Sequence, residues 1–212
     1  MFKGIFNNIK KPFIRYRKYI IVTIIIFIIS TIYGALRVGS ISPEEALSIN
    51  EEFLQPIFTE NPFNDFIAKY FGSSIFWLIL LRNISATAIV LYGSLISVGI
   101  IGIFAIISNG QLIGLALNVL TTASKLPLYK IVLAGILPHG FIELPAFFLA
   151  CSLGLYAGTN TIRTIFKKND LTFLELIKRF THILISIIIP LLIVAALIEA
   201  YITPIIFEFV SS

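Results

Sequence analysis

The chain has 212 residues, of which 58% are hydrophobic and only 13% are charged, and its mean hydropathy is +0.97. A soluble domain cannot cover so much apolar surface, because roughly half apolar content is usual for soluble proteins. Long, nearly continuous apolar runs such as Ile20–Ile29 and Ile183–Leu197 exclude a membrane β-barrel, whose strands alternate apolar and polar residues. The composition therefore predicts an all-α polytopic membrane protein, because helices satisfy their own backbone hydrogen bonds in lipid.

The net charge of +5 and the pI near 9.4 do not indicate nucleic-acid binding. The basic residues cluster beside apolar runs, where anionic lipid headgroups are the simpler partner. The first long apolar run continues into Arg37 and exceeds the roughly 7–15 residues of a signal-peptide core, so we expect a retained span. The single Cys151 cannot form an internal disulfide.

Residues 1–18 are predicted to form a basic interfacial helix. Phe2, Ile5, Phe6 and Ile9 recur at helical spacing and give the segment one apolar face. We expect this helix to stop near Pro12. The segment contains no acidic residue and six basic ones, which by the positive-inside rule predict a cytoplasmic N-terminus: Lys3, Lys10, Lys11, Arg15, Arg17 and Lys18.

Residues 39–75 are acidic and too polar to span a membrane. Ser42 is suited to cap a helix that begins at Pro43, with Glu45 reaching back to the cap. A second amphipathic helix is expected after Asn61-Pro62. We interpret the region as a helical extracytoplasmic segment that rests on the membrane, with these acidic residues: Glu44, Glu45, Glu51, Glu52, Glu60 and Asp65.

Residues 19–212 are predicted to form a single membrane domain. The second and third spans are separated at Ser108-Asn109-Gly110, the fourth is kinked near Pro138, and the fifth is kinked at Pro190 and closed by Pro204. The five expected spans cover residues 19–36, 82–107, 111–123, 129–158 and 182–201.

Five spans place the C-terminus outside the cell membrane if the N-terminus is cytoplasmic. The loop at residues 159–180 should then be cytoplasmic, and its charge agrees with that side. The alternative is a re-entrant hairpin at residues 110–137 that enters from the cytoplasm. It would place this basic loop outside the cell membrane. The loop's basic residues, which outnumber Asp170 and Glu175, are Arg163, Lys167, Lys168, Lys178 and Arg179.

The most informative polar residues lie inside the fourth span. His139 and Glu143 are four residues apart and share one face of a helix. Pro138 and Gly140 loosen the same turn and can free carbonyl groups for a ligand. One hypothesis is a structural pair that ties helices together; the other is a site for a proton, an ion or a substrate.

A second cluster contains Asn109, Gly110, Gly114 and Asn118. The two glycines form a small-xxx-small pair, which allows close approach of two helices. Helix packing is one interpretation of this cluster, and a polar pathway lined by the two asparagines is the other.

Glu199 lies in the outer third of the last span, at a depth similar to Arg37 and Arg82. On depth, an ion pair with one of these arginines is expected, rather than a site shared with Glu143. His182 and Cys151 lack the sequence context of zinc ligands or of a nucleophile. We therefore expect no catalytic, cofactor or metal site, and no enzymatic activity.

The polar motifs together resemble the stage II sporulation protein M family. The resemblance covers most of residues 75–205, and its specific part is Pro-His-Gly-x-x-Glu-Leu at residues 138–144. Further matching residues are Asn109-Gly110, Pro145-Ala146, Gly154, Gly158, Ile198-Glu199-Ala200 and Pro204. The family comprises small polytopic membrane proteins of bacteria and archaea. In endospore formers its namesake anchors and localises peptidoglycan-degrading partners and is not itself a hydrolase.

The resemblance implies a non-enzymatic membrane scaffold with membrane or cell-envelope protein partners. The competing hypothesis is a small transporter or channel built around His139 and Glu143, for which a homo-oligomer is one arrangement. A hydrated cavity that reaches Glu143 would favour transport, whereas sealing by Phe141, Phe147 and Phe148 would remove its support.

Overall fold

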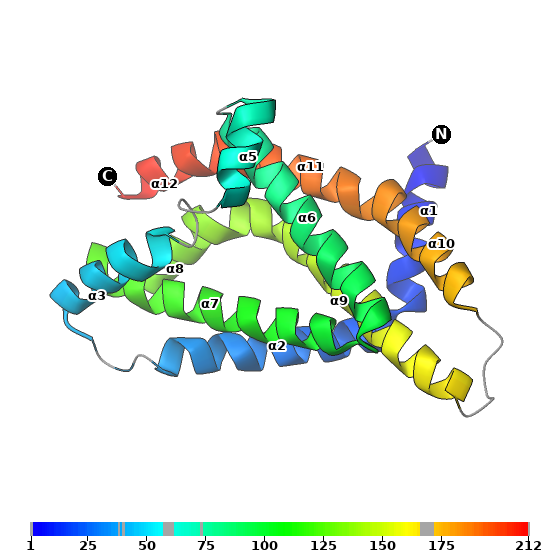
Figure 1. Ribbon diagram of the computed structural model, residues 1–212. Helices are drawn as coiled ribbons and strands as arrows, with labels where there is room; N and C mark the ends of the chain where they lie inside the picture. Colours follow the sequence, from blue (N-terminus) through cyan, green and yellow to red (C-terminus); the bar gives the residue numbers. More distant parts are fainter. Residues whose placement is uncertain are drawn as a thin grey trace.

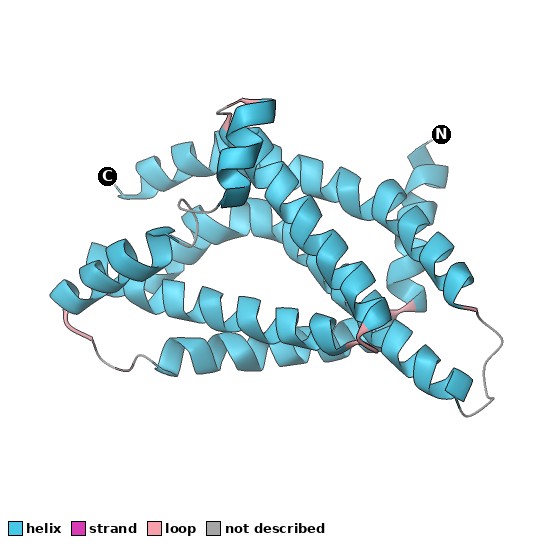
Figure 2. Cartoon of the chain, in the orientation of Figure 1, coloured by secondary structure: helices cyan, strands magenta, loops and turns pink. Residues whose placement is uncertain are grey.

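In a computed structural model, the described residues form helices joined by short turns and loops, with no strand among them; they are residues 2–37, 39, 41–56, 62–72, 74–165 and 172–211 (Figures 1 and 2). This confirms the predicted all-α class. Several residues named above lie outside the described part, or their side chains do: Phe2, Lys3, Ile5, Phe6, Glu60, Asn61, Lys167, Lys168 and Asp170.

Five helical rods among the described residues are long and apolar enough to cross a membrane. The first three are single helices: α2 (Arg17–Arg37), α6 (Ile75–Ile96) and α7 (Ile100–Ser124). The fourth runs over Leu128–Arg163 and the fifth over Phe173–Val210. Residues 110–124 belong to α7, which is long and apolar enough to cross a membrane, and this favours a span over the alternative re-entrant hairpin at residues 110–137.

The fourth and fifth rods are assembled from shorter helical pieces. Their order in the chain is α8 (Leu128–Ile131), η2 (Val132–Ile136), α9 (Leu137–Ile165), α10 (Phe173–Ile183), η3 (Leu184–Ile188), α11 (Ile189–Leu197), η4 (Ile198–Ile202) and α12 (Thr203–Ser211). The pieces labelled η are π-helical turns, which are wider than α-helical ones.

Each π-helical turn in the described chain ends two residues before a proline. In the membrane domain the prolines are Pro138, Pro190 and Pro204. A proline lacks the backbone N–H and its ring collides with the carbonyl four residues earlier, and a wider turn moves that carbonyl aside. The kinks predicted near Pro138 and Pro190 therefore take the form of π turns. The prediction that Pro204 closes the last span is wrong, because the helix continues to Ser211.

The boundary between the second and third spans lies at residues 97–99, so its predicted position at Ser108–Gly110 is wrong. Val98 and Gly99 adopt positive φ angles of 55° and 90° and reverse the chain there. The turn is packed against α9, where a Cβ on Gly158 would lie 2.3 Å from the Val98 carbonyl oxygen. Hydropathy does not mark this turn, because it is as apolar as the helices it joins.

Helices α2 and α7 lie side by side in close contact through glycines (Figure 1). A Cβ on Gly114 would lie 2.0 Å from the Thr31 carbonyl oxygen, and one on Gly110 would lie 2.7 Å from Ser30 Cβ. Asn118 ties the same two helices, because its side-chain amide donates to the Ala35 carbonyl at 3.0 Å. The packing interpretation of the second polar cluster is therefore confirmed for both glycines.

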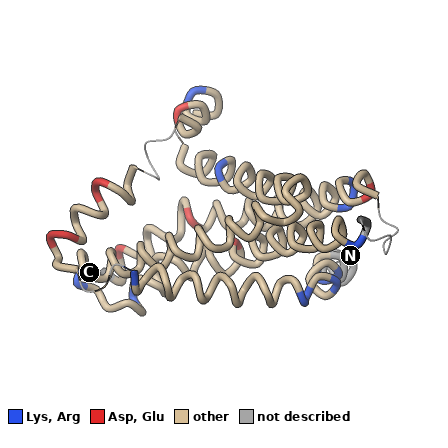
Figure 3. The backbone as a smooth tube through the Cα atoms, turned by 60° about the horizontal axis from the view of Figure 1, so that its bottom comes forward, with Lys and Arg blue, Asp and Glu red and all other residues tan. Residues whose placement is uncertain are grey.

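The basic N-terminal helix α1 (Phe2–Arg15) passes through Pro12 instead of stopping there, and the chain bends at Tyr16. The α-helical hydrogen bond from the Tyr16 N–H to the Pro12 carbonyl is kept at 2.9 Å, so the helical pattern continues past the proline. Lys and Arg gather at this end of the bundle, whereas the acidic α3 region lies at the opposite end (Figure 3).

The acidic segment is largely helical where it is described, as predicted. It contains α3 (Pro43–Ile49), η1 (Asn50–Leu54) and α5 (Pro62–Phe71). The predicted capping box is present: the Ser42 N–H donates to Glu45 Oε2 at 2.8 Å, and the Glu45 N–H donates to Ser42 Oγ at 3.2 Å. Ala46 and Leu54 are buried against Val119 of α7, so the segment is held by the protein itself.

Candidate intramembrane polar site

His139 and Glu143 lie on one face of α9, because the helix remains continuous through Gly140. Both side chains are partly buried, within a rod of high hydropathy. The π turn η2 and then Leu137 and Pro138 precede His139 in the fourth rod. The predicted pair therefore exists as a shared face, without a helix break between its members.

Glu199 joins this pair, contrary to the expectation from depth. It lies within the π turn η4, and its carboxylate, the His139 ring and the Glu143 carboxylate have ligand atoms that all lie within 4.8 Å of one another. Thr203, one turn later, is 3.3 Å from His139 Nδ1 through its hydroxyl. The depth argument failed because the last rod continues to Val210 instead of ending near residue 201, so Glu199 lies well inside it.

Arg82 of α6 supplies the positive charge beside this cluster. Its guanidinium interacts electrostatically with Glu199, and Glu199 in turn interacts with Glu143. Arg82 is thus the arginine whose charge acts on Glu199, and an ion pair between the two side chains stays a prediction. Arg37 instead lines a separate surface pocket beside Phe53.

A small cavity of about 80 Å³ reaches Glu143 from the α6 side. Its polar lining consists of Asn83, Thr87, Asn109 and Glu143. One water needs roughly 10–15 Å³ of such space and two to four polar partners, so the four polar lining residues can hold one or two waters. Phe147 lines this cavity beside Glu143, whereas the Phe141 ring is 76% exposed on the outer surface and does not seal Glu143.

The charges of the cluster do not balance. The cluster contains the carboxylates of Glu143 and Glu199 and the imidazole of His139, and the guanidinium of Arg82 acts on it electrostatically. An unpaired carboxylate inside an apolar bundle costs several kcal/mol, so the remaining negative charge requires a bound proton or cation. Imidazole nitrogen and carboxylate oxygen also suit a divalent transition metal, although no metal-ligand spacing is visible in the sequence.

Some members of the site could be foreseen and others could not. Pro138 and Gly140 flank His139 as predicted, and Asn109 reaches the cavity while donating to the Ala105 carbonyl at 2.9 Å. Asn118 is not part of the site, because it binds α2. The missed residues are Asn83, Thr87 and Thr203; their only sequence signal is polarity inside an apolar span, with Asn83 and Thr87 four residues apart.

The sequence profile of the stage II sporulation protein M family matches residues 23–204, which include every member of the site. This chain belongs to the stage II sporulation protein M family. An uncharacterized protein of Methanocaldococcus jannaschii is 31% identical over 187 residues, covering 87% of this chain and 93% of its own length. No solved structure matches the chain. Family membership and the five apolar rods together make this family member an integral membrane protein.

Proposed function

We propose that this family member binds and releases a proton or small cation at the cluster of His139, Glu143 and Glu199, and acts as a small transporter. The observation that carries the proposal is the excess carboxylate beside a polar cavity among apolar helices. π-helical turns inside longer helices are frequent at functional sites, and η2 precedes His139 while η4 contains Glu199.

The test is Glu143→Gln, which keeps the size of the side chain and removes its charge. We expect wild-type proteoliposomes to show a pH-dependent cation flux. The flux of the variant should be at least tenfold lower, whereas its thermal stability should change little. Glu52→Gln, on the exposed acidic segment, is the control and should behave as wild type. If the variant is less stable but its flux per folded protein is unchanged, His139 and Glu143 form a structural pair, because breaking a buried pair destabilises the folded protein.

The second candidate is the scaffold role, which a different surface favours. The α3–η1 segment exposes Glu44, Glu45, Glu51 and Glu52, and residues 41–56 contain no lysine or arginine. Because the segment is packed on α7, these carboxylates are held as one fixed acidic surface. Such a surface suits a basic segment of a membrane or cell-envelope protein. In this proposal, as in the first, the protein is not an enzyme.

The scaffold candidate also depends on orientation, and we propose a cytoplasmic N-terminus with the acidic segment and the C-terminus outside. A photo-crosslinking residue at Ser48, which is exposed between the carboxylates, should yield a defined protein adduct in cells of the native host. Glu51→Lys/Glu52→Lys should abolish that adduct, whereas Glu208→Lys at the C-terminal end should not. An adduct that survives the reversal of both charges would exclude recognition by this surface.

A further inference from the structure

The cluster of His139, Glu143 and Glu199 has the donor atoms of a metal site. One imidazole nitrogen and two carboxylate oxygens all lie within 4.8 Å of one another. Among the described residues, no other three His, Cys, Asp or Glu side chains are placed to hold one ion. Two ligand atoms of one zinc ion lie at most about 4.4 Å apart, which is twice a bond of about 2.2 Å. Small movements of these side chains therefore bring all three atoms onto one ion.

The two carboxylates of the cluster lack the hydrogen-bond donors that a polar group inside a bundle needs. Among the described residues, burial and the charges of neighbouring side chains act on Glu143 and Glu199, but no donor reaches either of them. His139 is different, because the Thr203 hydroxyl lies 3.3 Å from its Nδ1 atom. A hydrogen bond of this kind orients the imidazole of a metal ligand. The protein therefore holds the ring and leaves the carboxylate oxygens for an ion.

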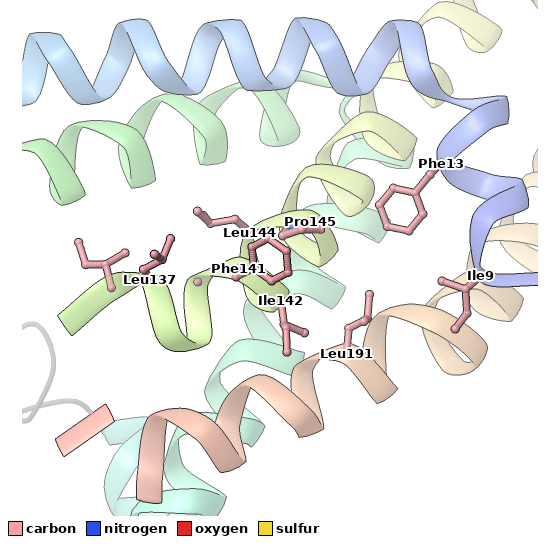
Figure 4. A pocket seen from close by; sticks show the side chains of 10 residues that line it. Ile9, Phe13, Leu137, Phe141, Ile142, Leu144, Pro145 and Leu191 are labelled. Carbon is pink, nitrogen blue, oxygen red and sulfur yellow. The ribbon is translucent and has the colours of Figure 1, made fainter. Parts of the chain in front are cut away.

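Glu143 connects the cluster to the polar cavity beside α6. It is the member of the cluster that lines this cavity, together with Asn83 and Asn109. The opposite side of α9 is apolar: at about 3.6 residues per turn, Phe141 and Leu144 point away from Glu143, and they line a groove that has no polar side chain in its wall (Figure 4). The polar surroundings that an ion needs therefore lie on the α6 side of the cluster.

We propose that the cation bound here is a divalent transition-metal ion, such as Zn²⁺, Fe²⁺ or Co²⁺, with His139, Glu143 and Glu199 as its ligands. This inference rests on the proposed function, whose site it shares, and it names the class of ion. An imidazole ligand favours such ions over Mg²⁺ and Ca²⁺, which prefer oxygen ligands. A dication neutralises both carboxylates. The charge of Arg82, which acts on Glu199, repels the ion and so favours its release.

The test is a Co²⁺ titration of the detergent-purified, chelator-treated protein, followed by the visible absorption of the bound ion and by thermal unfolding. The wild type should bind one Co²⁺ per chain and be stabilised by it. Zn²⁺ should displace this ion, and a roughly hundredfold excess of Mg²⁺ should not. His139→Gln, Glu143→Gln and Glu199→Gln should each weaken binding by about a hundredfold or more, because even the outer partners of metal ligands contribute about 10–100-fold. His182→Gln and Glu52→Gln, at exposed positions, are the matched controls and should bind as the wild type does.

Thr203→Val leaves all three ligands in place and should weaken Co²⁺ binding about tenfold, so it keeps the proposal testable if a glutamine variant does not fold. The metal site is excluded if the wild type binds no Co²⁺, if Mg²⁺ displaces the ion as readily as Zn²⁺ does, or if all three glutamine variants bind it unchanged. A proton or monovalent-cation flux that Glu143→Gln still abolishes would then leave the proposed function standing. Co²⁺ binding without any flux into vesicles would have the opposite meaning, a metal site in a protein that does not transport.

Discussion

Gly114→Ala is expected to prevent the protein from reaching its folded state. The added methyl group would lie 2.0 Å from the Thr31 carbonyl oxygen and 2.7 Å from the Ala35 nitrogen, and both are backbone atoms that cannot rotate away. Helices α2 and α7 would have to separate along their whole contact. We expect a loss of about 4 kcal/mol or more in the free energy of unfolding, a magnitude confined to core overpacking and similar defects.

The measurement is thermal unfolding of the detergent-purified protein, followed by size-exclusion chromatography. Gly135→Ala is the matched control, because its new methyl group would meet only the Phe207 ring, at 3.6 Å. Alanine is the better helix former by about 1 kcal/mol, so this control should be neutral or slightly stabilising. A folded Gly114→Ala protein with wild-type thermal stability would show that α2 and α7 are not this close.

Arg82→Met is expected to produce the second large effect. The substitution leaves Glu199 without the guanidinium that offsets part of its charge. Removing one charge of a fully buried pair costs about 3–5 kcal/mol, because the other charge is left uncompensated. Arg82 is only partly buried, so we expect a smaller loss of about 1–3 kcal/mol in unfolding free energy, measured by denaturant titration in detergent.

A double variant separates charge balance from lost packing. Arg82→Met/Glu199→Gln should recover most of the stability, because it removes one carboxylate together with the guanidinium. Arg82→Met/Glu52→Gln should recover none, since Glu52 is exposed on the acidic segment. If Arg82→Met alone changes stability by less than about 0.5 kcal/mol, Arg82 does not stabilise the cluster.

Local sequence signals determined much of the fold. The apolar runs fixed the helical membrane class and the number of spans, because backbone groups in lipid must be satisfied within a segment. Ser42, Pro43 and Glu45 fixed the start of α3, because a capping box needs only neighbouring residues. The spacing of Gly110 and Gly114 identified a close helix contact, although not that α2 is the partner.

Tertiary structure alone decided the remaining features. Asn109-Gly110 has the composition of a turn, yet it continues as helix because Gly110 is needed against Ser30 of α2. The true turn at Val98-Gly99 is apolar and is held by Gly158 of α9, 59 residues further along the chain. A contact across such a sequence distance leaves no local pattern from which a boundary can be predicted.

The composition of the site divides in the same way. His139 and Glu143 could be paired from sequence, because their spacing on one helix fixes a shared face. Glu199 could not be added, since its approach depends on how the last rod, which continues past Pro204 to Val210, packs against the fourth. The sequence by itself determined which charged residues enter the membrane. Only the packing of bent helices decided which of them meet, because the position of one helix against another is a property of the whole bundle.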